Sequence, residues 1–351
     1  MMKEFRQIWI SGATPFERGA DYGRQAAAEI DVCVNTYVDH FKRNYGMNWD
    51  TVRALSAKHL PLLDKRTPEQ VEEMHGIAQG AGKDPLDILA LNCRYELLHY
   101  PAMNECTAYA LLREATRDGR VYLGQNWDQR PFLLPHCLIL HIEEADGMRI
   151  LGHTEAGQLI RNGINSHGLG FCANSLRSSA DGRGEGIPAN FLRRRLLTCT
   201  RFDEMLDMLV GAERAISNNY CLASAENKAA DVEGIPGHTA VLRPENGVIT
   251  HANHILSKPE LDTTKGGKFR GERLAALLCV KAGDITKGYL KECLKDHFGY
   301  PESICSHVEE SENDIGKLWQ TNASIIYDLD ALELDICYGP PCSGEYKTYK
   351  L

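Results

Sequence analysis

The chain has 351 residues, of which 43% are hydrophobic, and a formal net charge of -9. This length allows one large domain or two ordinary ones with a substantial core. The acidic balance, without any Lys/Arg-rich run, argues against a nucleic-acid partner, because affinity for phosphates depends on clustered cations. No stretch approaches the roughly 20 apolar residues of a bilayer span, and the first residues lack a signal-peptide core, so we expect a cytoplasmic protein without a membrane partner.

The first third of the chain has a helical pattern. From Pro15 to about Leu98, apolar residues recur at spacings of three and four. Thr67 and Pro68 are typical of a helix start, with a capping residue followed by a proline in the first turn. We therefore expect residues 1–105 to form a mainly helical N-terminal segment.

From Cys106 onward the hydrophobic period changes to two, in short runs separated by turn signals. The predicted strands are 107–112, 120–126, 136–143, 148–155, 158–165, 168–176, 218–226, 229–234, 238–244, 247–254, 322–330 and 332–339. The predicted helices are 188–199, 201–211, 272–283 and 285–298. This order favours two packed sheets with helices outside, a four-layer αββα sandwich of α+β class. Residues 106–351 would form the catalytic core, in one compact domain with 1–105.

The twelve cysteines are scattered through apolar surroundings, which is typical of buried thiols in a chain too large to need disulfides. No pair has CxxC spacing, and the 13 histidines form no HxxxH or HExxH set. The sequence therefore predicts no metal site and no other cofactor.

Cys106 differs from the other cysteines because it stands where the helical segment gives way to the first strand. If the bond between Glu105 and Cys106 were cut, Cys106 would carry both a thiol and a free α-amine. An α-amino group has a pKa of about 7.7–8.0, so this residue would hold its own general base beside its nucleophile.

An ordered series of segments carries a family resemblance. It runs through CTAYALLREATRDGRVYLGQNWD from Cys106, then NGINSHGLGFCANS, THANHIL, SIC, NASIIYDLD and YGPPC. The series resembles the acyl-coenzyme A:6-aminopenicillanic acid acyltransferase family, a branch of the N-terminal-nucleophile hydrolases also catalogued as self-processing cysteine peptidases. The resemblance extends from HGIAQGAG, at 75–82, to the C-terminus. It implies an αββα fold, autocatalytic cleavage before Cys106, and amide-bond or acyl-transfer chemistry.

The resemblance also implies roles for individual residues. Cys106 would be the nucleophile, and Asp128 would hold and orient its ammonium group. Asn253 would donate its side-chain amide to the oxyanion. Asn174 would be a second oxyanion contributor, through its backbone N–H, and Gln125 would face the substrate pocket. Without the resemblance, Asp128 and Asn253 would each be interpreted as turn residues.

Two positions depart from the family pattern. Glu105 replaces the glycine that usually precedes the cysteine, and a glutamate tolerates backbone strain less readily than a glycine does. Ser306 stands where we expect an arginine that supports the active-site acid, which leaves Arg130 or Arg161 as substitutes. Ser306 is also a candidate pocket residue.

Two basic features lie close to Asn253 in the sequence. We interpret His251 and His254 as structural, because strand spacing prevents both from facing one site together with Asn253. The basic loop 263–273 could contact a nucleotide phosphate, but we expect a solvated loop.

Three function classes follow. The favoured one is hydrolysis of a small N-acyl amide, with acyl transfer, including transfer from an acyl-CoA, as the alternative reaction. Cleavage would yield an αβ heterodimer, and a homo-oligomer is compatible with the family. The second class is an unprocessed papain-like protease that uses His153 or His297, and the third is a catalytically silent binding protein.

Overall fold

The computed structural model describes residues 4–98, 106–182, 185–308 and 318–351. Its helices are α1 (Pro15–Gln25), α2 (Ala27–Tyr45), α3 (Trp49–Ala57), α4 (Leu60–Arg66), α5 (Pro68–Ala81), α6 (Pro85–Asn92), α7 (Arg94–Leu98), α8 (Ala189–Leu196), α9 (Phe202–Val210), α10 (Phe269–Cys279) and α11 (Lys287–Cys293).

The strands of the described residues are β1 (Arg6–Ile10), β2 (Cys106–Leu111), β3 (Tyr122–Gln129), β4 (Cys137–Glu143), β5 (Arg149–Glu155), β6 (Asn162–Asn165), β7 (Leu169–Ser175), β8 (Asn218–Ser224), β9 (Lys228–Ile235), β10 (His238–Leu242), β11 (Val248–His251), β12 (Gln320–Asp328), β13 (Glu333–Tyr338) and β14 (Tyr346–Lys350).

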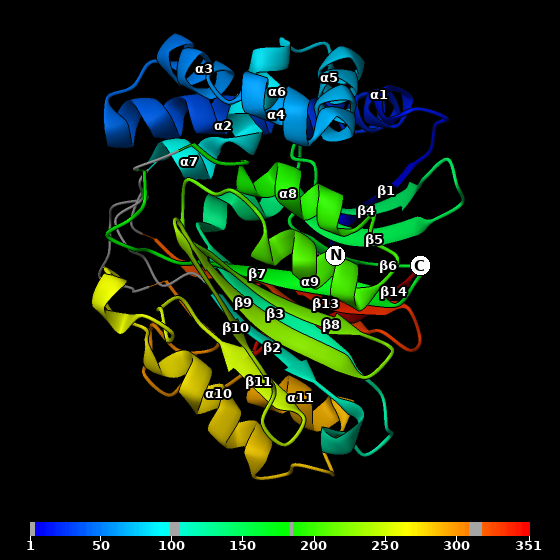
Figure 1. The fold of residues 1–351 in the computed structure, drawn as a ribbon, viewed down its shortest axis with the longest axis vertical. Helices are drawn as coiled ribbons and strands as arrows, with labels where there is room; N and C mark the ends of the chain where they lie inside the picture. Colours follow the sequence, from blue (N-terminus) through cyan, green and yellow to red (C-terminus); the bar gives the residue numbers. More distant parts are fainter. Residues whose placement is uncertain (1–3, 99–105, 183–184, 309–317) are drawn as a thin grey trace.

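These strands form two sheets. Over the described ranges, one has eight strands in the order β1-β4-β5-β6-β7-β8-β9-β10, and the other has six in the order β11-β2-β3-β12-β13-β14. The sheets lie between two groups of helices: α1–α7 lie beyond the first sheet, and α10 and α11 beyond the second (Figure 1). The expected four-layer αββα sandwich is confirmed.

Three apolar clusters correspond to the three interfaces between these layers. The first joins α1–α9 to the outer face of the eight-stranded sheet. The second lies between the two sheets and contains Cys106, Leu123 and Trp127. The third joins α10 and α11 to the outer face of the six-stranded sheet and contains Tyr109 and Leu278. Alternate residues of β2 therefore face opposite layers, as the strand period requires.

Local signals explain how the helical layer begins. Thr14 caps α1 through a capping box with Glu17, and Pro15 occupies the first turn. The helices α1 and α5 pack backbone to backbone, since a Cβ at Gly19 would lie 2.0 Å from the carbonyl oxygen of Glu73. Such a close crossing requires glycine at the contact.

Two strands were absent from the prediction. The strand β1 pairs in parallel with β4, so the N-terminal segment is not only helical but also supplies an edge strand. The strand β14 pairs with β13 and is largely polar. Both are five residues long and lie at sheet edges, where one-sided burial leaves a weak periodic signal. None of the helices in the described part of the chain is both long and apolar enough to cross a bilayer.

Candidate active site

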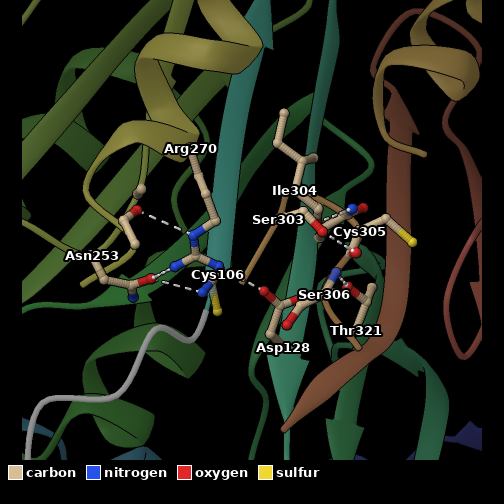
Figure 2. Close-up of polar contacts among 12 residues, drawn as sticks. Cys106, Asp128, Asn253, Arg270, Ser303, Ile304, Cys305, Ser306 and Thr321 are labelled. Atoms are coloured by element: carbon tan, nitrogen blue, oxygen red, sulfur yellow. Dashed lines mark hydrogen bonds and ion pairs between the residues drawn. The ribbon is translucent and has the colours of Figure 1, made fainter. Parts of the chain in front are cut away.

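The pairing of β2 with its neighbours places the predicted site residues side by side. β11 pairs antiparallel with β2, with His251 opposite Ala108, so the chain two residues beyond β11 arrives beside Cys106. There the backbone N–H of Cys106 donates to Oδ1 of Asn253 at 2.8 Å (Figure 2). On the other side, β3 pairs with β2, with Trp127 opposite Cys106, and carries Asp128 to the same end of the sheet.

A buried arginine connects Asn253 to Asp128. Arg270, the second residue of α10, donates from Nη2 to Asn253 Oδ1 at 2.6 Å and from Nη1 to Asp128 Oδ2 at 2.8 Å (Figure 2). The other carboxylate oxygen of Asp128 accepts a hydrogen bond from Thr321 Oγ1 at 2.6 Å. Cys106, Asp128 and Arg270 have no exposed surface. A buried ion pair is tolerated when further hydrogen bonds satisfy its atoms, as they do here.

Arg270 corrects two sequence-based interpretations. The cation that pairs with Asp128 is neither Arg130, which lies over the Trp319 ring, nor Arg161, which lies over the Trp127 ring. The loop 263–273 is also not simply solvated, because its last residues begin α10 and bury Arg270. The one sequence feature that could have indicated a buried role for Arg270 is its position at the start of an amphipathic helix that follows a Gly-rich loop.

Ser306 supports the site through Thr321. Its N–H donates to Thr321 Oγ1 at 2.9 Å, and its hydroxyl donates to the carbonyl of Pro301 at 3.2 Å. Ser306 therefore orients the threonine that in turn donates to Asp128. Thr321 was not among the predicted site residues, because nothing in NASIIYDLD or its flank distinguishes it from an ordinary strand threonine.

The side chain of Cys106 belongs to the apolar cluster between the sheets, together with Trp127. The guanidinium of Arg161 lies 4.6 Å from the centre of the Trp127 ring. Burial lowers the pKa of Arg161, but Tyr95 and Cys106 raise it, and the net shift is upward.

Gln125 and Asn174 link the two sheets. The amide of Gln125 donates to the carbonyl of Ala173 at 2.8 Å and to Asn174 Oδ1 at 2.7 Å. Asn174 in turn donates to the carbonyls of His251 and Ala252, each at 3.1 Å. These contacts stabilise the end of β11, two residues before Asn253. The predicted pocket role of Gln125 and oxyanion role of Asn174 stay predictions.

Asn253 lies at Cys106 as expected, but with its carbonyl oxygen toward the cysteine. Its amide nitrogen donates instead to the carbonyl of Ser175 at 2.9 Å. In the intact chain, Asn253 is thus an acceptor for the nitrogen of Cys106, and its predicted role as oxyanion donor stays a prediction. Glu105, the other half of the predicted cleavage site, lies outside the described residues.

His251 forms a buried ion pair that supports the turn carrying Asn253. Its Nε2 lies 2.8 Å from Glu233 Oε1, and Glu233 also accepts hydrogen bonds from the N–H groups of Leu256 and Ser257. Burial lowers the pKa of His251, but Asp231 and Glu233 raise it, to about 9. The contacts agree with a structural role for His251.

We expect His251 to make the stability of this turn pH-dependent. A pKa of about 9, above the ordinary 6.5, means that its contribution is complete below about pH 6.5 and is lost as pH rises through about 9. Replacing His251 by Gln should therefore lower the free energy of unfolding by on the order of 1–3 kcal/mol at pH 7 and by much less at pH 10. Denaturant titrations at both pH values measure the difference.

The exposed His167 offers a matched control, and His167→Gln should leave stability nearly unchanged at both pH values. Other groups that titrate between pH 7 and 10 do so in parent and variant alike, so only the difference between the two proteins counts. A loss for His251→Gln that is the same at pH 7 and pH 10 would show that His251 is not held as a cation.

Comparison with known families shows which family the chain belongs to. The model of the acyl-coenzyme A:6-aminopenicillanic acid acyl-transferase family matches residues 115–342, a region that includes Asp128, Asn253 and Arg270. The chain belongs to this family. Membership makes the protein an enzyme of acyl-group chemistry, as the resemblance implied.

Individual relatives agree with this assignment. The chain is 26% identical over 336 residues to the 40 kDa form of acyl-coenzyme A:6-aminopenicillanic-acid-acyltransferase from Emericella nidulans, covering 93% of this chain and 91% of the relative.

Solved structures that are similar include a mutant of conjugated bile acid hydrolase from Clostridium perfringens, with 16% identity, a TM-score of 0.47, and coverage of 70% of this chain and 97% of that one. They also include penicillin V acylase from Agrobacterium tumefaciens, with 12% identity, a TM-score of 0.46, and coverage of 66% and 83%.

Proposed function

We propose that this protein is an N-terminal-nucleophile cysteine enzyme that cleaves its own chain before Cys106 and then forms an acyl-enzyme from a small N-acyl amide or thioester. The observation that carries the proposal is the hydrogen bond from the backbone nitrogen of Cys106 to Asn253 Oδ1, beside the buried Arg270. That nitrogen would become the α-amine after cleavage. A polar network centred on it, contributed by distant segments, is unusual for an ordinary strand residue.

The network suits a terminal amine that must act as a base. Asn253 Oδ1 would accept a hydrogen from the amine and fix its direction. Arg270 already occupies the same oxygen, and its positive charge disfavours protonation of a second nitrogen there. The amine would therefore stay neutral near pH 7, which a general base requires. Asp128 keeps Arg270 in place through its ion pair.

Self-cleavage and turnover would use the same two atoms. In the intact chain, the Cys106 sulfur attacks the carbonyl carbon of Glu105, the C–N bond breaks, the nitrogen takes a proton, and water hydrolyses the resulting thioester. In turnover, the thiol proton passes to the α-amine while the sulfur attacks the substrate carbonyl. The leaving amine, or thiol for a thioester, departs with that proton. Water or an amine acceptor then attacks the acyl-enzyme and releases Cys106.

The cleaved segments would stay together as an αβ heterodimer and one domain. β1 pairs with β4 across the cleavage position, and apolar side chains of α1–α7 share a core with those of β4, α8 and α9. An interface of this kind resembles a domain core and is typical of permanent association. An acyl-CoA is one candidate acyl donor, and we favour hydrolysis because water is always available as acceptor.

Mass spectrometry of the purified protein tests the proposal. We expect the intact 39.2 kDa chain to be replaced by two chains, the second beginning at Cys106. Incubation with phenylacetyl amides, N-acyl amino acids and acyl thioesters should give an acyl adduct on the peptide that begins with Cys106. Free acid as product indicates hydrolysis, and a new amide formed in the presence of an amine acceptor indicates transfer.

A chain that stays intact on prolonged incubation contradicts self-cleavage. Absence of any adduct at Cys106, with no selective labelling by a thiol probe, would instead support a non-catalytic binding protein. An acyl adduct at Cys106 on the uncleaved chain would support Cys106 as the nucleophile but contradict the proposed role of its α-amine as the base.

A further inference from the structure

Four side chains of metal-ligating types, two histidines and two cysteines, lie together in the structure. His297, Cys305, His307 and Cys342 each contribute one ligand atom, and these atoms all lie within 4.8 Å of one another. Three of the residues follow α11 within the same connecting segment, and Cys342 comes from the turn between β13 and β14. We refer to these four residues as the Cys2His2 cluster.

The three distances from His307 match the edges of a tetrahedral zinc site. His307 Nε2 lies 3.1 Å from His297 Nε2, 3.5 Å from Cys305 Sγ and 3.4 Å from Cys342 Sγ. With Zn–N near 2.0–2.1 Å and Zn–S near 2.3 Å, a regular tetrahedron has edges of about 3.3 Å between two nitrogens and about 3.6 Å between nitrogen and sulfur. The three distances measured from His307 agree with these values to a few tenths of an ångström.

Hydrogen bonding alone cannot account for this packing. A ring nitrogen carries either one hydrogen or one lone pair, so His307 Nε2 can make a single good hydrogen bond. It nevertheless has three polar neighbours within 3.5 Å. A cation between the four atoms would satisfy all of them at once, through one lone pair from each imidazole and one thiolate from each cysteine.

We propose that the Cys2His2 cluster binds a zinc ion in a closed, structural site. Two thiolates and two imidazoles form a ligand set that suits zinc better than magnesium or calcium. Four protein ligands leave no open position for substrate, which is typical of a structural site. His297 and Cys342 are solvent-exposed, so metal ions can reach the cluster from solution.

The zinc would connect the turn between β13 and β14 to the segment after α11, which supports Asp128 through Ser306 and Thr321. Cys305 directly precedes Ser306, whose N–H donates to Thr321 Oγ1, the donor to Asp128 (Figure 2). The Cys305 N–H donates to the carbonyl of Asp296 at 3.0 Å. The ion would thus position Ser306 and Thr321 from a distance and take no part in the chemistry.

This proposal revises the expectation that the chain has no metal site. That expectation rested on the absence of CxxC, HxxxH and HExxH motifs. The cluster uses Cys305-x-His307 and completes the set with His297 and a cysteine 35 residues beyond His307. Such spacing is recognisable only after folding.

Metal analysis of the full-length protein tests the site. Protein purified without chelator and kept reduced should contain about one zinc per chain by elemental mass spectrometry. Replacement of zinc by cobalt(II) should give the charge-transfer and ligand-field bands of tetrahedral thiolate coordination. Cys342→Ser and His307→Ala should each weaken zinc binding by on the order of 100-fold or more.

Cys279→Ser is the matched control, because Cys279 is an exposed cysteine on α10 outside the cluster, and it should bind zinc as the parent does. Cys342 is exposed, so its replacement should leave the fold intact even if His307→Ala does not fold. Failure of the reduced parent to bind zinc or cobalt overturns the proposal. A disulfide between Cys305 and Cys342 in purified protein, with no metal binding after reduction, also overturns it.

Discussion

The Cys106→Ala protein should remain a single chain of full length and lose about 10³–10⁶-fold of its acyl-group activity. The expected loss is large because one atom, Sγ of Cys106, is the nucleophile both for self-cleavage and for turnover. Removing a nucleophile leaves only the catalysis that binding and oxyanion donors provide. Intact-mass measurement and initial rates on an N-acyl amide are the two measurements required.

Two further variants separate chemistry from packing. Cys172→Ala removes a neighbouring buried sulfur from the same cluster between the sheets, and it should cost stability but keep cleavage and activity. Cys106→Ser keeps a nucleophilic side chain of similar size and should process slowly. Full amidase activity in Cys106→Ala would remove the nucleophile assignment, whatever the state of the chain.

The Arg270→Leu protein should be less stable by about 3–5 kcal/mol and lack both cleavage and activity. Loss of the guanidinium leaves Asp128 buried with one of its charge-assisted hydrogen bonds missing, and a buried unpaired charge is costly. It also frees Asn253 Oδ1 from the contact that fixes it near Cys106. Denaturant unfolding gives the stability change, and intact mass gives the processing state.

Arg273 provides a control on the same helix. It pairs with Asp296 at 2.7 Å but is partly exposed, so Arg273→Leu should cost less than about 1 kcal/mol and leave processing unchanged. The double variant Arg270→Leu with Asp128→Asn should regain part of the lost stability, because no unpaired charge remains, but no activity. If Arg270→Leu and Arg273→Leu lower the free energy of unfolding equally, burial of the Arg270–Asp128 ion pair does not determine its contribution to stability.

Much of the candidate site could be predicted from the sequence because its residues lie in short local motifs. Cys106 stands at the change from helical to strand periodicity. The family resemblance, through QNWD and HANH, is what singles out Asp128 and Asn253. The structure brings Asn253 to Cys106 and joins Asp128 to both through Arg270. The strand pattern also predicted most of both sheets, because alternation of buried and exposed residues is a property of a few consecutive residues.

Arg270, Thr321 and the Cys2His2 cluster could not be predicted in this way. The sequence does not indicate that an arginine in a basic Gly-rich loop is buried. Arg270 becomes buried because α10 packs against the six-stranded sheet and places its side chain between Asp128 and Asn253. Thr321 and Ser306 gain their roles only from the pairing of β12 with β3 and the path of the chain after α11. The four candidate ligand atoms come from two segments that meet only when the turn after β13 lies beside the segment that follows α11.

The sequence by itself determined the fold class, the family and the position of the predicted nucleophile, since these depend on periodicity and on short ordered motifs. Only the tertiary structure decided which cation balances Asp128, which atom of Asn253 faces Cys106, and which cysteines and histidines lie together. The physical reason is that charge pairing and metal ligation depend on distances of a few ångströms between side chains far apart along the chain, which register and helix packing set.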